Sequence, residues 1–194
     1  MMVDRGRHPK KPIAQALRAG GLQVTFVVDH RFTDDELEAF FARVDDATPI
    51  REQGRTFVQF DRDAATLADA VVTSLRDLEA AGFHASAVRS DDLVTPRQIA
   101  TRTGRSYESV RTLAAGTRGP GGFPAPLQSE GWSLYSWAQV GPWFARHYPR
   151  ADTDRELLNT EHDRIIATAD HLVRARALMA GNDLAAGLTA LILA

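Results

Sequence analysis

A run of hydrogen-bonding side chains lies between two glycines near the middle of the chain, where residues 105–115 read RSYESVRTLAA. Arginine can donate paired hydrogen bonds to guanine, serine and threonine can bond base edges or phosphates, and glutamate can accept from cytosine. On one face of a helix, such side chains can read base pairs in the major groove of duplex DNA. The side chains expected at or beside the bases are Arg105, Ser106, Tyr107, Glu108, Arg111 and Thr112.

The first of two short helices that position these side chains is predicted to begin at Thr95 and Pro96. A threonine side chain can accept a hydrogen bond from a free backbone N–H of the first turn, and proline fits that turn. Ile99 and Ala100 are expected to face inward. Gly104 then breaks the helix after about two turns, because glycine is a strong turn signal.

The second helix is predicted to begin after Ser106, which offers another N-terminal cap, and to end at Gly116. Its apolar residues recur at intervals of three and four and therefore share one face. These residues are Val110, Leu113 and Ala114. Two short helices joined by a glycine-containing turn are typical of a helix-turn-helix.

A second set of side chains flanks the polar face and suits the DNA backbone, where contacts position a protein without reading sequence. Arg118 can also reach the minor groove from the loop that follows. We expect phosphate contacts from Thr95, Arg97, Arg102, Thr117 and Arg118. The alternative interpretation is an ordinary pair of packed helices with a polar outer face.

The segment after these helices is predicted to form a wing. Residues 118–126 read RGPGGFPAP, which is incompatible with a helix. We expect a β-hairpin from residues 123–127 and 132–135, followed by a short helix that Ser136 caps. Helix, turn, helix, hairpin and helix, in this order, make a winged helix-turn-helix.

Residues 93–147 resemble the DNA-binding domains of excisionases and MerR-like regulators, in particular actinobacterial regulators with a GPGGFPAP wing. The matching motifs are TPRQIA, GRS followed by Val110 and Leu113, Phe123-Pro124, and WAQVGPW. The resemblance implies a winged helix-turn-helix, DNA binding, and pairing of two subunits through a helix after the winged domain. Thr112 and Leu113 stand where many MerR regulators carry an aromatic pair, which disfavours a metal or drug sensor of that family.

Charge is unevenly distributed along the chain, although the net charge is only −2. Residues 95–151 carry a net charge of +5 and residues 1–20 a net charge of +4. Residues 21–94 carry −8 and residues 152–194 carry −3. A basic module beside acidic segments suits a DNA-binding protein that must avoid indiscriminate binding.

Residues 21–92 are predicted to form a ferredoxin-like α+β domain. Residues 22–29 read LQVTFVVD, a buried strand, and Thr33 with Glu36 forms a capping box before an amphipathic helix. The apolar face of that helix is expected to comprise Leu37, Phe40, Phe41 and Val44. Further strands at 49–52, 55–61 and 83–89 and a helix at 66–81 complete a βαββαβ order.

Three roles fit this acidic domain: dimerisation, sensing of a small ligand, or docking of a protein partner on residues 22–90. RNA binding by the sheet is disfavoured because the segment is acidic and has no Arg-Gly-Phe type stacking motif. Asp91, Asp92 and Leu93 leave almost no linker, so the two domains are expected to move as one body.

The two ends of the chain are assigned by pattern. Residues 1–20 are predicted to be a basic flexible arm, and residues 150–194 to form helices that pair two subunits. A long helix is expected at 153–179, with the apolar residues 188–194 seeking a partner surface. The stripe expected on the long helix is Leu158, Ile165, Ala169, Leu172 and either Arg176 or Leu178, with Ile166 and Val173 beside it.

The composition favours a soluble, cytoplasmic, nucleoid-associated protein that is not an enzyme. The 194 residues are 44% hydrophobic, include no cysteine, and contain neither a signal peptide nor a membrane-length apolar run. The six histidines form no metal-binding motif, so neither metal nor cofactor is expected. Asp29 and His30 are the best catalytic candidates, but a strand end followed by an acidic helix start explains them better.

These patterns predict a dimeric, sequence-specific, double-stranded DNA-binding protein, most simply a transcriptional regulator. Two alternatives stay open: an accessory architectural factor in excision, recombination or partition, and a protein-interaction adaptor that does not bind DNA.

Overall fold

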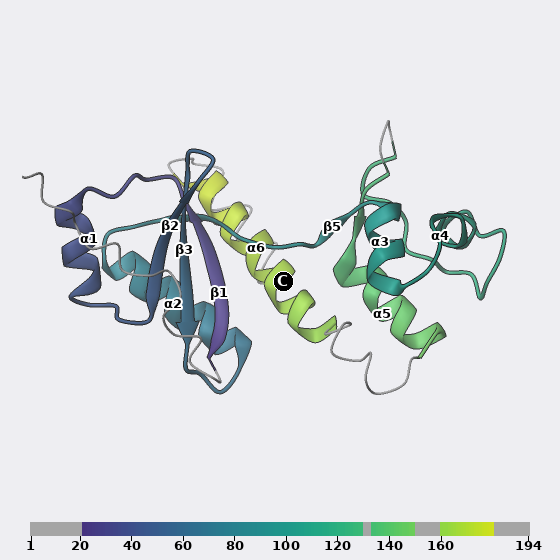
Figure 1. Cartoon of the computed structure of the whole chain (residues 1–194), viewed down its shortest axis with the longest axis horizontal. Helices are drawn as coiled ribbons and strands as arrows, with labels where there is room; N and C mark the ends of the chain where they lie inside the picture. Colours follow the sequence, from purple (N-terminus) through teal and green to yellow (C-terminus); the bar gives the residue numbers. More distant parts are fainter. Residues whose placement is uncertain (1–20, 130–132, 150–159, 181–194) are drawn as a thin grey trace, which may run out of the picture.

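A computed structural model of the chain describes residues 21–129, 133–149 and 160–180. It is a mixed α+β structure with two lobes, and helix α6 (Thr160–Met179) runs between them (Figure 1). One lobe contains a four-stranded sheet, and the other contains helices α3, α4 and α5. Each lobe has its own buried apolar cluster.

The sheet of the first lobe is antiparallel throughout, with the strand order β2-β3-β1-β4. Alternate residues of β1, such as Val24, Phe26 and Val28, are buried, as a strand with one covered face requires. Gln53 and Gly54 form the turn between β2 and β3, and both residues have positive φ, which matches the twist of a tight hairpin. The strands are β1 (Leu22–Val28), β2 (Ala47–Glu52), β3 (Arg55–Arg62) and β4 (Ala85–Val88).

Two helices of this lobe begin after threonine caps, of which the one at Thr33 was predicted. Helix α1 (Asp34–Phe41) has the full capping box of Thr33 and Glu36, and α2 (Leu67–Ala80) begins after Thr66. The expected apolar face of α1 is wrong in part, because the helix ends at Phe41. Phe40 is fully buried, whereas the Phe41 side chain points away from the core and is 49% exposed.

Helix α6 packs against β4 and α2 of the same chain. Its buried side chains, Ile166, Ala169 and Val173, join the core of the sheet lobe, and the Asp170 carboxylate accepts a hydrogen bond from the Val88 N–H at 3.0 Å. The expected stripe through Leu172 and Leu178 is wrong by part of a turn, since these residues are 49% and 82% exposed.

The second lobe contains two helices of eight residues each, a short sheet and a third helix. The short sheet pairs Leu93 with Ser136 and Val94 with Tyr135, and this pairing of the start of the lobe with the residues just before the third helix was not predicted. The elements are β5 (Leu93–Val94), α3 (Pro96–Thr103), α4 (Tyr107–Ala114), β6 (Tyr135–Ser136) and α5 (Trp137–His147).

The predicted wing hairpin is largely wrong for the part of the chain that the structure describes. Residues 123–127 form no strand, and the ladder is reduced to one antiparallel bridge between Gln128 and Leu134. Three prolines in the run from residue 120 to 126 remove backbone donors, which explains the missing ladder.

Several predicted segments lie outside the described residues. They are the basic arm 1–20, the hairpin tip 130–132, residues 150–159 and the apolar segment 181–194. None of the helices described by the structure combines the length and apolar character needed to cross a membrane.

Candidate nucleic-acid interface

Helix α3 begins and ends as predicted. The Thr95 hydroxyl accepts from the Gln98 N–H, and the Gln98 side chain in turn accepts from the Thr95 N–H at 2.8 Å. This reciprocal pair fixes the first turn and occupies the Thr95 hydroxyl. At the other end, Gly104 adopts a left-handed conformation with φ 62° and turns the chain toward α4.

Helix α4 has a cap at each end. The Ser106 hydroxyl accepts from the Ser109 N–H at 3.1 Å. Gly116 has φ 67°, and the N–H of Thr117 donates to the Thr112 carbonyl at 3.1 Å, which closes the last turn in a Schellman motif. The Thr117 hydroxyl donates to the same carbonyl, so its position is fixed by the helix end.

The inner face of α4 is apolar, and its outer face carries the predicted polar residues. Val110 and Leu113 are buried in the lobe's core. Ser106, Tyr107, Glu108 and Arg111 are exposed, whereas Thr112 is half-buried and donates to the Ser109 carbonyl. The structure therefore brings together the residues expected to approach the bases, on the first two turns of one helix.

Arg111 and Glu108 form a bidentate ion pair on this face. The guanidinium Nε lies 3.0 Å and Nη2 lies 2.7 Å from the two carboxylate oxygens. The hydrogen bonds from Arg111 hold the pKa of the Glu108 carboxyl below its ordinary value and raise the pKa of Arg111. Any base contact by Arg111 therefore competes with Glu108 for the same N–H groups.

A depression of about 480 Å³ lies between α4 and the loop that follows it. It is lined by Arg105, Ser106, Glu108, Thr112 and Arg118, five of the predicted site residues, together with Ser109, Leu113, Gly119 and Tyr148. Ser109 and Tyr148 were not singled out from the sequence. Ser109 sits one turn from Ser106 on the same helix, so the helical spacing alone could have found it.

Two of the predicted arginines are held by stacking within the lobe. The Arg105 guanidinium lies 3.9 Å from the centre of the Tyr148 ring, and that of Arg102 lies 5.0 Å from the Trp137 ring. Arg102 also donates from Nη2 to the Asp91 carbonyl at 2.9 Å. Both side chains therefore fix the geometry of the lobe, and their remaining N–H groups are what a phosphate can use.

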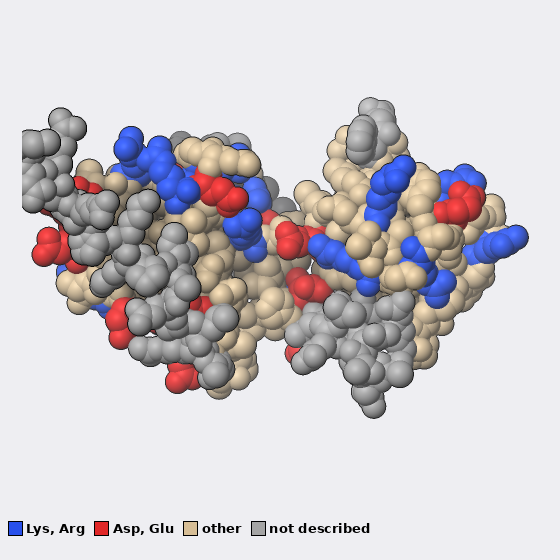
Figure 2. Space-filling view, viewed as in Figure 1, with Lys and Arg blue, Asp and Glu red and all other residues tan. Residues whose placement is uncertain are grey.

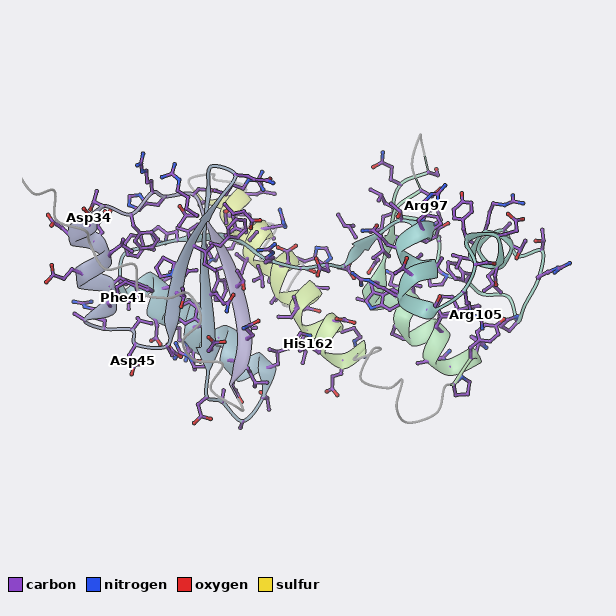
Figure 3. All side chains as sticks on the ribbon, in the orientation of Figure 1. Asp34, Phe41, Asp45, Arg97, Arg105 and His162 are labelled. Carbon is purple, nitrogen blue, oxygen red and sulfur yellow. The ribbon has the colours of Figure 1, made fainter. Side chains whose placement is uncertain are left out.

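Arg97 lies at the start of α3, away from Arg105, which follows the end of that helix (Figure 3). Its guanidinium is 5.1 Å from the centre of the Tyr107 ring, so the pair joins the N-terminal turns of α3 and α4. Both side chains are exposed. The pair presents one cation and one phenol beside the outer face of α4.

Arginine side chains are spread over the lobe that carries α3 and α4, with few acidic side chains on the same face (Figure 2). This matches the net charge of +5 over residues 95–151. Glu108 is the one acidic residue that the structure describes between Thr95 and Pro149. A phosphate backbone approaching this lobe meets predominantly positive side chains.

The loop after α4 is tied to α5 although it has few backbone pairs. The Trp143 indole donates to the Gly121 carbonyl at 3.0 Å, and Phe123 packs edge-on against the same indole with ring centres 4.8 Å apart. Gly119 has φ 88°, and a Cβ there would lie 2.5 Å from the Leu113 side chain. The loop therefore depends on a glycine where it passes closest to the core.

Asp92 is a structural residue that sequence reasoning missed. The side chain is 8% exposed, and Oδ1 accepts from the Ser136 hydroxyl at 3.0 Å and from the Ala138 N–H at 2.6 Å. The Asp92 carboxylate therefore caps α5, and the expectation that the Ser136 side chain does so is wrong. No local signal marks this role, because Asp92 and Ala138 are 46 residues apart in sequence.

Of the two weak catalytic candidates, His30 has a structural partner. His30 lies 3.0 Å from Glu36 in the capping box of α1. The Thr33 N–H, followed by His30, lowers the pKa of Glu36 to about 2. His162 is 3.9 Å from its neighbour Asp163, which accepts from the Trp137 indole at 2.8 Å. Among the residues described, no cluster of three or more histidine or acidic side chains could hold a metal ion.

Comparison with protein-family models, curated proteins and solved structures returned no significant match.

Proposed function

We propose that the chain is a sequence-specific, double-stranded DNA-binding protein that acts as a dimeric transcriptional regulator, with α4 as the helix that enters the major groove. The observation that carries the proposal is the outer face of α4. There Ser106, Tyr107, Glu108 and Arg111 are exposed on one rigid, doubly capped helix. Short recognition helices of this kind present their first turns to base edges.

The fold assignments that we propose rest on connectivity. The strand order β2-β3-β1-β4, antiparallel throughout, is the order expected of a ferredoxin-like βαββαβ domain. For residues 93–149, the succession of α3, turn, α4, loop and α5 supports a winged helix-turn-helix with a reduced wing. The short sheet of β5 and β6 pairs the start of that unit with the residues just before α5.

Different residues are proposed for different tasks. Arg111 and Tyr107 are assigned to the bases, because they are exposed on the outer face of α4, and Glu108 is assigned to tuning Arg111, with which it is paired. Arg97 and Arg118, exposed on either side of that face, are assigned to phosphates. Phosphate contacts position a protein on DNA, and base contacts specify the sequence. A place on the bacterial nucleoid follows from this proposal.

The test is selection of bound duplexes from a random DNA pool at two salt concentrations, followed by Kd measurements on the selected site. Recovery of an inverted repeat, with half-sites about one helical turn apart, is the expected result for a dimer. Arg111→Ala should lower affinity at one base pair by about 1–3 kcal/mol and change the preferred sequence.

Arg97→Ala should weaken all sequences alike and reduce the salt dependence by about one phosphate contact. Arg51→Ala, an exposed arginine on β2 of the other lobe, is the matched control and should change neither property. If Arg111→Ala and Arg97→Ala behave identically across a panel of sites, the assignment of roles is wrong. Sequence-blind binding with strong bending would favour an architectural factor, and no binding would favour an adaptor.

A further inference from the structure

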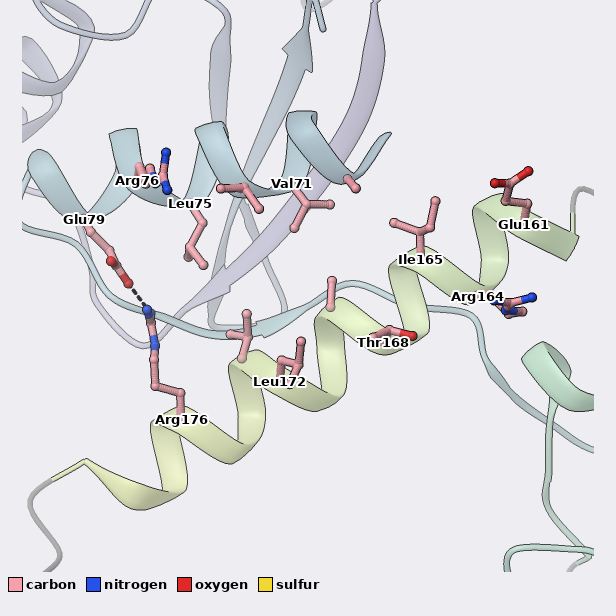
Figure 4. A pocket seen from close by; sticks show the side chains of 14 residues that line it. Val71, Leu75, Arg76, Glu79, Glu161, Arg164, Ile165, Thr168, Leu172 and Arg176 are labelled. Atoms are coloured by element: carbon pink, nitrogen blue, oxygen red, sulfur yellow. Dashed lines mark hydrogen bonds and ion pairs between the residues drawn. The ribbon is translucent and has the colours of Figure 1, made fainter. Parts of the chain in front are cut away.

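An apolar groove of about 570 Å³ runs between α2 and α6 (Figure 4). Its floor and walls are mostly aliphatic, with Val71, Val72 and Leu75 from α2 and Ile165 and Leu172 from α6. Val72 is 45% and Leu172 is 49% exposed. Apolar side chains this exposed on both helices of one groove favour an occupant.

Charged side chains lie at both ends of the groove. Arg176 of α6 forms an ion pair with Glu79 of α2 where both helices approach their C-terminal ends (Figure 4). Arg76 lies near this pair, and Glu161 and Arg164 of α6 line the opposite end (Figure 4). An occupant with an acidic residue at the Arg176 end and an apolar stripe beyond it would match this distribution.

Residues 181–194 read GNDLAAGLTALILA and contain such a pattern. Leu184, Leu188, Leu191 and Ile192 are spaced so that they share one helical face. Asp183 is the one charged residue of this segment, and it precedes the apolar stripe. Gly181 and Asn182 supply residues suited to a change of chain direction.

The lengths also match. Helix α6 ends at Met179, beside the Arg176–Glu79 pair, so the next residues leave the helix at the Arg176 end of the groove. Twelve residues in a helix span about 18 Å. The groove-lining stretch of α2, from Glu79 back to Ala68, rises about 16 Å.

We propose that residues 183–194 dock in the groove of their own chain as an amphipathic helix antiparallel to α2 and α6, with Asp183 near Arg176. The two-residue connection holds the segment at high effective concentration, which favours its own groove over that of a second copy. The inference does not depend on DNA binding.

Introduced cysteines test the placement cleanly, because the chain has none of its own. Leu188 lies five residues after Asp183, and Leu75 lies four residues before Glu79. Both are therefore about 6–8 Å along the groove from its Arg176 end. The variant Leu188→Cys with Leu75→Cys should form an intrachain disulfide, seen by mass spectrometry and as a faster-migrating monomer without reductant. The control pair Leu188→Cys with Ile50→Cys, on β2, should not.

A disulfide that links two chains would overturn the proposal in favour of a second copy as the occupant. Failure of the Leu188–Leu75 pair to react, at a rate no greater than the control pair, would overturn it as well. Binding of DNA plays no part in either readout, so the outcome is separable from that of the proposed function.

Thermal unfolding gives an independent readout. Leu172→Asp and Leu191→Asp should each lower Tm by about 3–10 °C, and together by little more than either alone, because both disrupt one contact. Leu178→Asp is the matched control on α6, since Leu178 is 82% exposed and does not line the groove. Equal or negligible Tm shifts for the three single variants would contradict the docking. An additive shift in the double variant Leu172→Asp with Leu191→Asp would contradict it as well.

Discussion

The Arg111 guanidinium donates two hydrogen bonds to the Glu108 carboxylate across one turn of α4, at 2.7 and 3.0 Å. The donors that could read a base are thus held by a neighbour on the same helix. In water such an exposed pair is weak, so a base that offers two acceptors can displace the carboxylate. Glu108 therefore competes with DNA bases for the N–H groups of Arg111 on the proposed recognition helix.

Replacing the competitor should therefore strengthen binding and relax selectivity. We expect Glu108→Gln to lower the Kd for DNA by about threefold to tenfold, because it frees Arg111 and removes a negative charge facing phosphates. The discrimination between the selected site and a one-base variant should fall. Fluorescence anisotropy on both duplexes checks this, with Glu38→Gln on α1 as the control. An unchanged Kd would mean that α4 does not face the DNA.

The cap that Asp92 provides can be tested by its removal. Asp92→Ala should lower the free energy of unfolding by about 1–3 kcal/mol, since the Ala138 N–H and the Ser136 hydroxyl lose a buried acceptor. Asp92→Asn keeps one acceptor oxygen and should cost less. Urea unfolding followed by tryptophan fluorescence reports on this lobe, because all three tryptophans fall between residues 132 and 143. Equal losses for the two variants would rule out a capping role.

The loop after α4 offers a comparison of two glycines. Gly119 and Gly121 both have positive φ, at 88° and 78°, but a Cβ at Gly119 would meet the Leu113 side chain and a Cβ at Gly121 meets nothing within 4 Å. Gly119→Ala should therefore destabilise the protein by about 1–2 kcal/mol more than Gly121→Ala. Thermal unfolding of the two variants isolates the steric part, and similar Tm values would show that the loop can move aside.

The capping box of α1 makes a prediction about pH. The pKa of Glu36 is lowered to about 2, so its charged form is favoured in the folded state. This contribution to stability is complete above the ordinary glutamate pKa of 4.5 and is lost as the pH falls through about 2. Glu36→Gln should be less stable than the parent at pH 7, and the difference should vanish by about pH 2.

Urea titrations at pH 7, 4.5, 3 and 2 measure this difference directly. Glu38→Gln changes the same charge on the same helix outside the capping box and serves as the control. A difference between Glu36→Gln and the parent that stays constant over this range would show that the carboxylate charge is not what holds the cap.

What the sequence predicted well are features set by a few neighbouring residues. The capping box at Thr33, the N-terminal cap at Thr95, the turn at Gly104 and the helix stop at Gly116 each depend on residues within one turn. Local backbone chemistry decides such features, whatever the rest of the chain does. The order of strands and helices in the sheet lobe followed from the same kind of signal.

What the sequence predicted poorly depends on distant partners. The sequence predicted Arg102 and Arg105 as cations available to DNA. In the structure their guanidinium groups stack on Trp137 and Tyr148, respectively. The buried face of α6 was misplaced because alanines and aliphatic residues occur on several sides of that helix, which blurs its periodicity. Only the packing against β4 selects Ile166 and Val173.

Since α6 supplies Ile166, Ala169 and Val173 to the core of the sheet lobe, that lobe is assembled from residues on both sides of the second lobe in the sequence. On the ribosome, the first ninety residues emerge long before the helix that completes them, and at about 5–20 residues per second the delay is several seconds. The core of the sheet lobe therefore lacks α6 while the second lobe is being synthesised. We expect α3, α4 and α5 to finish folding before the lobe that precedes them in the gene.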